Sequence, residues 1–385
     1  MSRALKNYDL LLEVCGPVFV GSGNEISKKE YLFLGNNTVG ILDINKLYML
    51  LHSKGLSAEF ETYMLDNRKE DLRQWLQRNR QPLADIKKCM KYTLESGNME
   101  IQKGTRIQIM EHIKDAYGNP YIPGSSVKGM LRTILLGGKV MSCHNEYDRE
   151  AELLFNELLS SEDSRQSQRL LRSRITQIES KAFHILEKSE NKKDAVNDLL
   201  SALIIGDSEP LKTRDLVLCQ KVEKNVNGRE KTLNLFRECI RPGTIIKCSM
   251  TIDESTAKKY GIQLKSEKMK KAIADFAAQY YSNFANKFPG AAKPEKNTVY
   301  LGGGCGFVSK TIMYQMFPGR EGVRAVKTVF DKTRVPRVHG HSQDLKSGVS
   351  PHILKCTRYQ GRTLEMGRCR IKIIEKAPVS RDACR

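Results

Sequence analysis

The stretch Tyr121–Leu136, YIPGSSVKGMLRTILL, constrains the fold most, because it changes from extended to helical within a few residues. Pro123 holds its predecessor extended, and the Gly-Ser-Ser that follows turns the chain. Apolar residues then recur at helical spacing: Val127, Met130, Leu131, Ile134 and Leu135. The pattern predicts a short strand, a turn and a helix with one apolar face.

The start of this helix has the features of an anion site. A serine just before the helix, Ser125 or Ser126, can accept hydrogen bonds from its free N–H groups, which carry the positive end of the helix dipole. Lys128 and Arg132 follow one turn apart and can project on the same face. We interpret this as a phosphate site; the alternative is an ordinary strand–turn–helix with two solvated cations.

The charge of the chain favours a polyanionic partner. The net charge is +20 over 385 residues, and residues 320–385, with 16 Lys or Arg and six Asp or Glu, carry +10 of it. The alternative is that the excess of positive charge serves solubility alone.

No apolar run approaches the roughly 18 residues of a membrane span, and the N-terminus enters a strand-like pattern directly, so we expect a cytoplasmic protein without a membrane partner. No cysteine pair has C-x-x-C spacing, which argues against a zinc ribbon.

The element pattern predicts an α+β chain in four parts. Residues 1–145 follow a β-rich, split βαβ order that is compatible with a ferredoxin-like half. Residues 146–203 are charged and helical, and form an inserted subdomain. Residues 204–319 form a second β-rich half, with expected hairpins at Asn227-Gly228 and around 241–244. Residues 320–385 are basic, rich in turns, and end in a strand over 368–375.

A second chemical signal is the run Gly302-Gly303-Gly304-Cys305-Gly306, followed by Lys310. Four glycines in five positions leave the backbone bare, so a sugar–phosphate chain can approach its N–H groups closely. The run is not a Walker A loop, because Ser309 stands where that motif has glycine before its lysine. The alternative is a tight turn.

Histidines matter because RNA cleavage without a metal needs a general base. His112 and His144 are the candidates for this role, and a histidine opposite the Gly-rich loop would be the distinguishing feature. His339 and His341 could together bind metal, but Asp344 is the one acidic residue near them, so we predict no metal site. Asp207 is expected to bond the backbone at a strand end.

Four motifs in this order carry a family resemblance: IPGSSVKGMLR (122–132), IGDSEPL (205–211), ECIRPGT (238–244) and LGGGCGFVSKT (301–311). Together they closely resemble the RAMP superfamily of CRISPR-associated proteins, and most of all the fifth subunits of Csm-type (type III-A) effector complexes. The segment VFVGSGNE, residues 18–25, resembles that family's loop after its first strand.

The resemblance implies a ferredoxin-like (RRM-type) RAMP core with a Gly-rich loop, a helical insertion and a basic C-terminal region. It implies a non-catalytic RNA-binding subunit for antiviral defence. Such a subunit caps the crRNA 3′ end of the filament beside the repeating backbone subunit and the small helical subunit, and takes part in crRNA maturation. Host nucleases are further partners, target RNA is reached indirectly, and no cofactor is implied. The alternative is a metal-independent endoribonuclease acting on precursor crRNA. The predicted RNA-binding residues are Ser22, Asn24, Gly124, Ser125, Ser126, Lys128, Gly129, Arg132, Gly302, Gly303, Gly304, Gly306 and Lys310.

Overall fold

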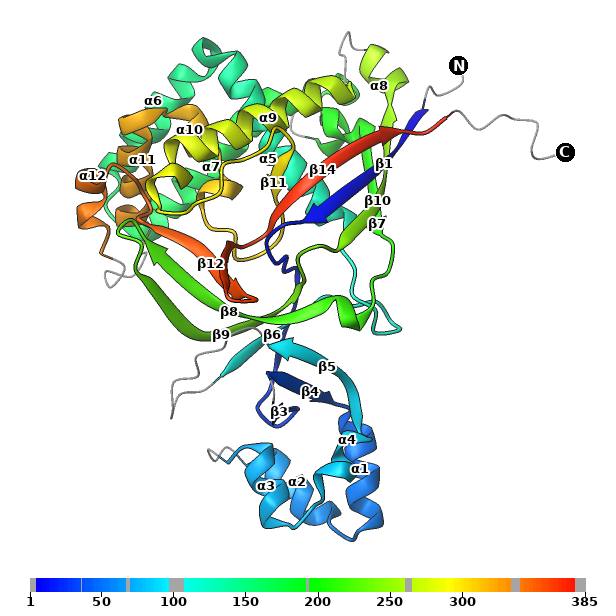
Figure 1. Ribbon diagram of the computed structural model, residues 1–385. Helices are drawn as coiled ribbons and strands as arrows, with labels where there is room; N and C mark the ends of the chain where they lie inside the picture. The colour runs from blue at the N-terminus through cyan, green and yellow to red at the C-terminus, as the bar shows by residue number, and fades with distance from the viewer. Residues whose placement is uncertain are drawn as a thin grey trace, which may run out of the picture.

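The computed structural model describes residues 5–35, 37–66, 70–96, 107–191, 194–259, 265–333 and 340–377. Two β-sheets form its frame, and most helices lie along one side of the first sheet (Figure 1). A smaller helical unit stands at the far end of the second sheet (Figure 1).

The first sheet has five strands in the order β11-β14-β1-β10-β7, and all neighbours are antiparallel. Its strands are β1 (Leu5–Val14), β7 (Leu203–Ser208), β10 (Ile245–Asp253), β11 (Thr298–Tyr300) and β14 (Arg368–Glu375). Alternate residues of β1, such as Leu10 and Leu12, are fully buried, as expected for a strand with one face on a core. The first strand therefore lies between two strands from the second half of the chain.

The second sheet is a curled sheet of nine strands (Figure 1). Its main path runs β2-β6-β9-β8-β5-β4-β3, and β12 joins it through β8 and pairs with β13. The strands are β2 (Gly21–Ile26), β3 (Tyr31–Gly35), β4 (Thr38–Leu42), β5 (Met90–Ser96), β6 (Gln108–His112), β8 (Leu216–Asn225), β9 (Glu230–Ile240), β12 (Ile353–Tyr359) and β13 (Arg362–Glu365).

One predicted hairpin is confirmed and one is wrong. β8 and β9 pair through the turn at Gly228, whose φ is +78°. The turn around 241–244 exists, but β9 and β10 belong to different sheets, so the chain there passes from one sheet to the other. Pairing between strands thus crosses the boundaries predicted near residues 145 and 319.

The main helical layer packs on the first sheet. It contains α5 (Gly124–Ser142), α6 (His144–Ser160), α7 (Ser164–Phe183), α9 (Ser266–Asn283), α10 (Met313–Met316) and α11 (Gly319–Lys332). The predicted apolar face of α5 is confirmed, since Val127, Leu131 and Ile134 are buried. Residues of α6 and α7 share the main core with α5 and the sheet, so the charged helical segment is part of the main body.

The separate core belongs instead to residues near the N-terminus. The helices α1 (Ile44–Ser53), α2 (Ser57–Leu65), α3 (Leu72–Arg78) and α4 (Leu83–Lys87) enclose their own apolar cluster with β3 and β4. Trp75 is fully buried there, with Phe60 and Tyr63 against its ring.

The remaining described elements are short. They are α8 (Glu254–Lys259), α12 (Asp344–Ser347) and the 3₁₀ turns Ala195–Asn197, Leu199–Ala202, Thr213–Asp215, Ala285–Lys287, Val308–Lys310 and His341–Gln343. Over the described ranges, no helix is both long and apolar enough to cross a bilayer.

Candidate nucleic-acid interface

The Gly-rich loop follows β11 and is fixed to the chain segment after β1. Leu301 N–H donates to Gly367 O at 2.8 Å, and Gly303 N–H donates to Phe19 O at 2.6 Å. Gly302 has φ +86°, and a Cβ there would lie 2.2 Å from Phe19 O. Only glycine fits this position, because a side chain would meet both an unfavourable backbone angle and a backbone atom. The loop is thus a rigid, closely packed turn with a bare outer edge.

That outer edge forms one wall of a basic pocket of about 300 Å³. Gly304 and Gly306 line it with their backbone. The facing cations are Lys221 of β8, Arg237 of β9, Lys355 of β12, and Lys310 just beyond the loop. Four positive side chains around exposed backbone form a site suited to a phosphate group.

Two of these cations share one carboxylate. Glu223 lies 3.1 Å from Lys221 Nζ and 2.6 Å from Lys355 Nζ. Burial raises the pKa of Glu223, but the two lysines more than offset this and bring it to about 2. Burial lowers the pKa of Lys355. The carboxylate therefore keeps the two lysines in place and cancels part of their charge.

Arg237 and Lys310 supply the uncompensated charge. Within the described ranges, neither forms an ion pair. The Arg237 guanidinium lies over the Phe19 ring, 5.6 Å from its centroid, and its carbon is 3.5 Å from where a Gly304 Cβ would be. Lys310 is exposed at the end of a 3₁₀ turn. The pocket thus has a planar donor that lies over an aromatic ring on one side and an exposed ammonium on the other.

The first turn of α5 differs from the prediction. The helix begins at Gly124 after Pro123, so both serines lie inside it, and the predicted serine cap is wrong. The side chain of Asp207 on β7 accepts the Gly124 N–H instead, at 2.7 Å. Gly124 itself packs on β7, since a Cβ would lie 2.3 Å from Ile205 O. A carboxylate therefore already occupies the positive end of this helix.

The two cations of α5 have different surroundings. Arg132 donates to Asp198 at 2.6 Å and to Glu179 at 3.4 Å, and lies over the Phe183 ring. Lys128 is half-buried, and burial lowers its pKa. An RNA contact at Arg132 would require it to leave two carboxylates, so its predicted role is less favoured than that of Lys128.

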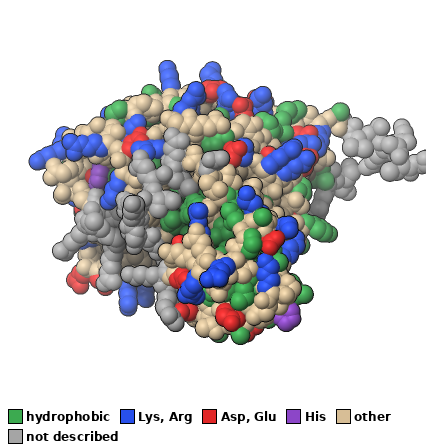
Figure 2. All heavy atoms as spheres, turned by 60° about the horizontal axis from the view of Figure 1, so that its bottom comes forward, with side chains coloured by type: hydrophobic (Ala, Val, Ile, Leu, Met, Phe, Trp, Pro, Cys, Tyr) green, Lys and Arg blue, Asp and Glu red, His purple; other side chains and the backbone are tan. Residues whose placement is uncertain are grey.

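The other predicted residues lie on separate surfaces. Ser125 and Gly129 are exposed on α5, and Ser126 is partly exposed. Ser22 and Asn24 on β2 donate to the Glu111 carboxylate at 3.1 and 3.3 Å. Among the described residues, no hydrogen bond or ion pair joins these groups to the Gly-rich loop. Figure 2 shows Lys and Arg spread among acidic residues on the face it views.

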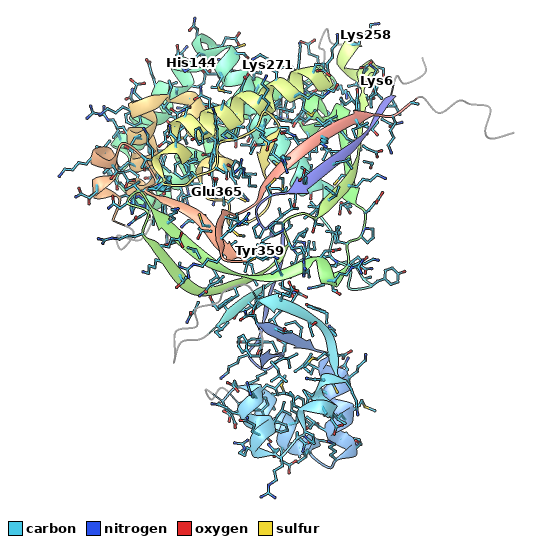
Figure 3. All side chains as sticks on the ribbon, in the orientation of Figure 1. Lys6, His144, Lys258, Lys271, Tyr359 and Glu365 are labelled. Carbon is cyan, nitrogen blue, oxygen red and sulfur yellow. The ribbon has the colours of Figure 1, made fainter. Side chains whose placement is uncertain are left out.

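The proposed general bases are poorly placed for RNA cleavage. His112 is fully buried, its Nδ1 accepts Val20 N–H and its Nε2 faces Tyr121 O at 3.3 Å. Burial lowers the pKa of His112 to about 4. His144 pairs with Asp148 at 2.6 Å and lies at the helical edge of the molecule, far from Tyr359 on β12 (Figure 3). His339 is outside the described residues.

Cysteine chemistry offers no substitute at the loop. Cys305 is buried, and its thiol donates to Leu301 O at 3.1 Å. Burial raises the pKa of this thiol to about 12, which keeps it protonated and unreactive at neutral pH.

Sequence reasoning missed Lys221, Arg237 and Lys355. They lie on three strands, and sheet pairing brings them together: Arg237 stands opposite Cys219, and Lys355 opposite Glu223. The alternation of Lys221 and Glu223 along one strand was the available signal for a shared face, but it did not reveal the partner strands.

Comparisons with known proteins agree on one family. The RAMP superfamily matches residues 11–309. The chain is 32% identical to Csm5 of Mycobacterium tuberculosis (strain CDC 1551 / Oshkosh), over 97% of this chain and 99% of that protein. It is 26% identical to Csm5 of Streptococcus thermophilus, over 82% of each. Its fold is similar to a chain in a cryo-EM structure of a Csm–crRNA–target RNA ternary complex of a type III-A CRISPR-Cas system, with a TM-score of 0.67, 20% identity, and coverage of 95% of this chain and 100% of that one. The chain therefore belongs to the RAMP superfamily and, within it, to the Csm5 family.

Proposed function

We propose that this protein is a non-catalytic, RNA-binding subunit of a type III-A Csm antiviral effector complex. Its partners are crRNA, the repeating backbone subunit and the small helical subunit. Support comes from the Csm5 relatives and from the likeness to a chain in a Csm–crRNA–target RNA complex. The observation that carries the RNA-binding role is the pocket of Arg237, Lys310, Lys221 and Lys355 against the bare backbone of the Gly-rich loop.

The pocket suits phosphate positioning and not base reading. Its donors are charged side chains and backbone groups, which contact phosphates without distinguishing sequence. A guide RNA of any sequence would therefore lie along the loop. We propose that this contact caps the crRNA 3′ end of the filament and governs maturation, by shielding RNA or by admitting other nucleases. Target RNA would be reached indirectly, through the guide.

The scaffold suggested for this role is a ferredoxin-like, RRM-type unit. The elements β1, α5, β7, β10, α9 and β14 follow one another as βαββαβ, and their spatial order is β14-β1-β10-β7. This arrangement supports the proposal of a RAMP core with a helical insertion and a basic C-terminal region. Strand pairing crosses the boundaries near residues 145 and 319. We therefore propose the four parts, divided near residues 145, 203 and 319, as regions of the sequence and not as separately folded domains.

The test is reconstitution of a Csm complex with variants of this chain. Arg237→Glu/Lys310→Glu reverses the two unpaired charges of the pocket, and Lys271→Glu on α9 is the matched surface control. After nuclease treatment, the pocket variant should leave crRNA whose 3′ ends are shorter than those from wild type or control. Identical 3′ ends in all three assembled complexes would reject the capping role.

The nuclease alternative has its own readout. The same purified chain is incubated with precursor crRNA in the presence of a chelator. We expect intact RNA, because the two candidate bases are poorly placed: His112 is fully buried and His144 is bound to Asp148. Cleavage under these conditions would favour the enzyme reading.

A further inference from the structure

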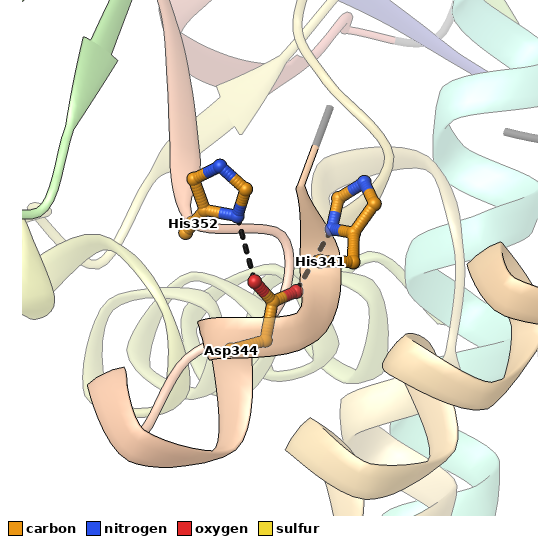
Figure 4. A group of neighbouring side chains, drawn as sticks. All are labelled: His341, Asp344 and His352. Atoms are coloured by element: carbon orange, nitrogen blue, oxygen red, sulfur yellow. Dashed lines mark hydrogen bonds and ion pairs between the residues drawn. The ribbon is translucent and has the colours of Figure 1, made fainter. Parts of the chain in front are cut away.

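Three side chains of types that bind metal ions lie together in the C-terminal part of the chain, outside the basic pocket. Asp344 begins α12, His341 lies in the 3₁₀ turn before it, and His352 precedes β12. Figure 4 shows the two imidazoles on either side of the Asp344 carboxylate. His341 Nδ1 is 2.9 Å from Oδ2, and His352 Nδ1 is 2.6 Å from Oδ1.

Asp344 poses an electrostatic problem. Its side chain is fully buried, and in the described part of the chain neither Lys nor Arg pairs with it. A buried carboxylate needs a compensating positive charge, because its removal from water costs several kcal/mol. A cation bound beside the carboxylate would supply this charge.

The donor set favours a cation. Two imidazoles and one carboxylate are ligands that zinc and other first-row divalent ions accept. One ligand atom from each residue lies within 4.8 Å of the others. Around a tetrahedral zinc with bonds of about 2.0–2.1 Å, ligand atoms stand about 3.3 Å apart. The present contacts of 2.6 and 2.9 Å would need to open by about 0.7 and 0.4 Å.

The surroundings hold the donors in position. Ser350 Oγ donates to Asp344 Oδ2 at 2.6 Å. The Tyr314 hydroxyl in turn donates to Ser350 O at 2.8 Å, and Ser350 N–H donates to that hydroxyl at 3.1 Å. The Phe330 ring lies 4.6 Å from the His341 ring. Such support around the ligands is typical of metal sites, where outer contacts fix ligand orientation.

We propose that His341, Asp344 and His352 form a structural site for a divalent transition-metal ion of the zinc class, with water in the fourth position. The side chains of His341 and His352 are 10% and 21% exposed, so water can reach the ion. Sequence analysis predicted no metal because it paired His341 with His339, and His352 is distant enough in the chain to have been overlooked.

The location assigns the ion a clamping role. His352 directly precedes β12, which carries Lys355 of the basic pocket. Phe330, which packs on His341, also packs on Phe307 at the end of the Gly-rich loop, at 5.0 Å. The ion would therefore fasten residues 341–352 to two walls of the pocket.

The test uses the full chain without a histidine tag, purified without chelator or metal resin. Elemental analysis should find close to one first-row metal ion per chain in wild type. Asp344→Asn and His352→Ala should lose it. The matched control His52→Ala, which changes a histidine on α1 bonded to Ser57, should retain it.

Cobalt gives a second readout that does not depend on the variants folding. Wild type stripped by chelator should take up Co²⁺ and show the visible absorption of a tetrahedral site, and zinc should abolish it. A stripped wild type that binds neither ion at small molar excess would overturn the proposal. Metal retained by Asp344→Asn would also overturn it, because the ion would lie elsewhere.

Discussion

Removing the two unpaired cations of the basic pocket should weaken RNA binding in a way that depends on salt. Arg237 and Lys310 have no carboxylate partner among the described residues, whereas Lys221 and Lys355 share Glu223. Arg237→Ala/Lys310→Ala therefore deletes two full phosphate contacts. Each contact with a single strand contributes about 0.7 to the slope of log affinity against log salt, so this slope should fall by about 1.4.

The same relation gives the loss of affinity. If the two contacts contribute nothing at 1 M salt, the double variant should bind about 25-fold more weakly at 0.1 M and about threefold more weakly at 0.5 M. The assay is fluorescence anisotropy of labelled guide RNA over a salt series. Two unrelated guide sequences should show the same loss, because phosphate contacts do not read bases.

Two controls separate charge from structure. Arg237→Lys/Lys310→Arg keeps both charges and should retain most of the slope. Lys271→Ala removes an exposed cation on α9, on the upper helical face in Figure 3, and should change nothing. An unchanged slope in the double alanine variant would refute the reasoning. So would an equal loss at every salt concentration, which would indicate a damaged fold.

Three further predictions concern the stability of the fold at Arg132, at His112 and at two glycines. Arg132→Ala should lower the free energy of unfolding in urea by about 1–3 kcal/mol, because it removes the charged hydrogen bond that the largely buried Asp198 carboxylate accepts at 2.6 Å; RNA affinity lost at unchanged stability would contradict this. His112, whose pKa is lowered to about 4, stays neutral while the unfolded chain takes up a proton. Stability should therefore fall by about 3 kcal/mol as the pH drops from about 6.5 to 4, and His112→Gln should lose this component of the pH profile; an identical profile in the variant would count against it. Gly302→Ala should destabilise by about 1–3 kcal/mol through its positive φ and the contact with Phe19 O, whereas Gly129→Ala, which has open space on an exposed helix face, should stabilise by about 0.5–1 kcal/mol in thermal unfolding; the reverse order would reject both.

Local sequence patterns correctly predicted the structural features that depend only on residues nearby in the chain. The spacing of Val127, Leu131 and Ile134 was sufficient for the buried face of α5, because helical periodicity is a local property. The cap of that helix was mispredicted, because its acceptor, Asp207, comes from a strand 83 residues away. A turn like that at 241–244 serves equally for a hairpin or for a passage between sheets, and only strand pairing decides.

The candidate site shows the same division. The Gly-rich loop was visible as a run of glycines, and its bare outer edge followed from that composition. The cations that face it come from β8, β9 and β12, and their meeting depends on strand register. His352 joins Asp344 for a similar reason, because the chain folds back between α12 and β12. Composition thus predicted a ligand class, but not the residues that we propose to hold it.

The position of β1 between β10 and β14 determines when the protein can finish folding. As the chain leaves the ribosome, its first strand has no lasting neighbour until residues 245–253 emerge, and one edge stays open until residues 368–375 follow. Unpaired strand edges invite pairing with other chains. The nascent protein therefore carries an adhesive edge through most of its synthesis, and early engagement of that edge by a chaperone would protect it until β14 closes the sheet.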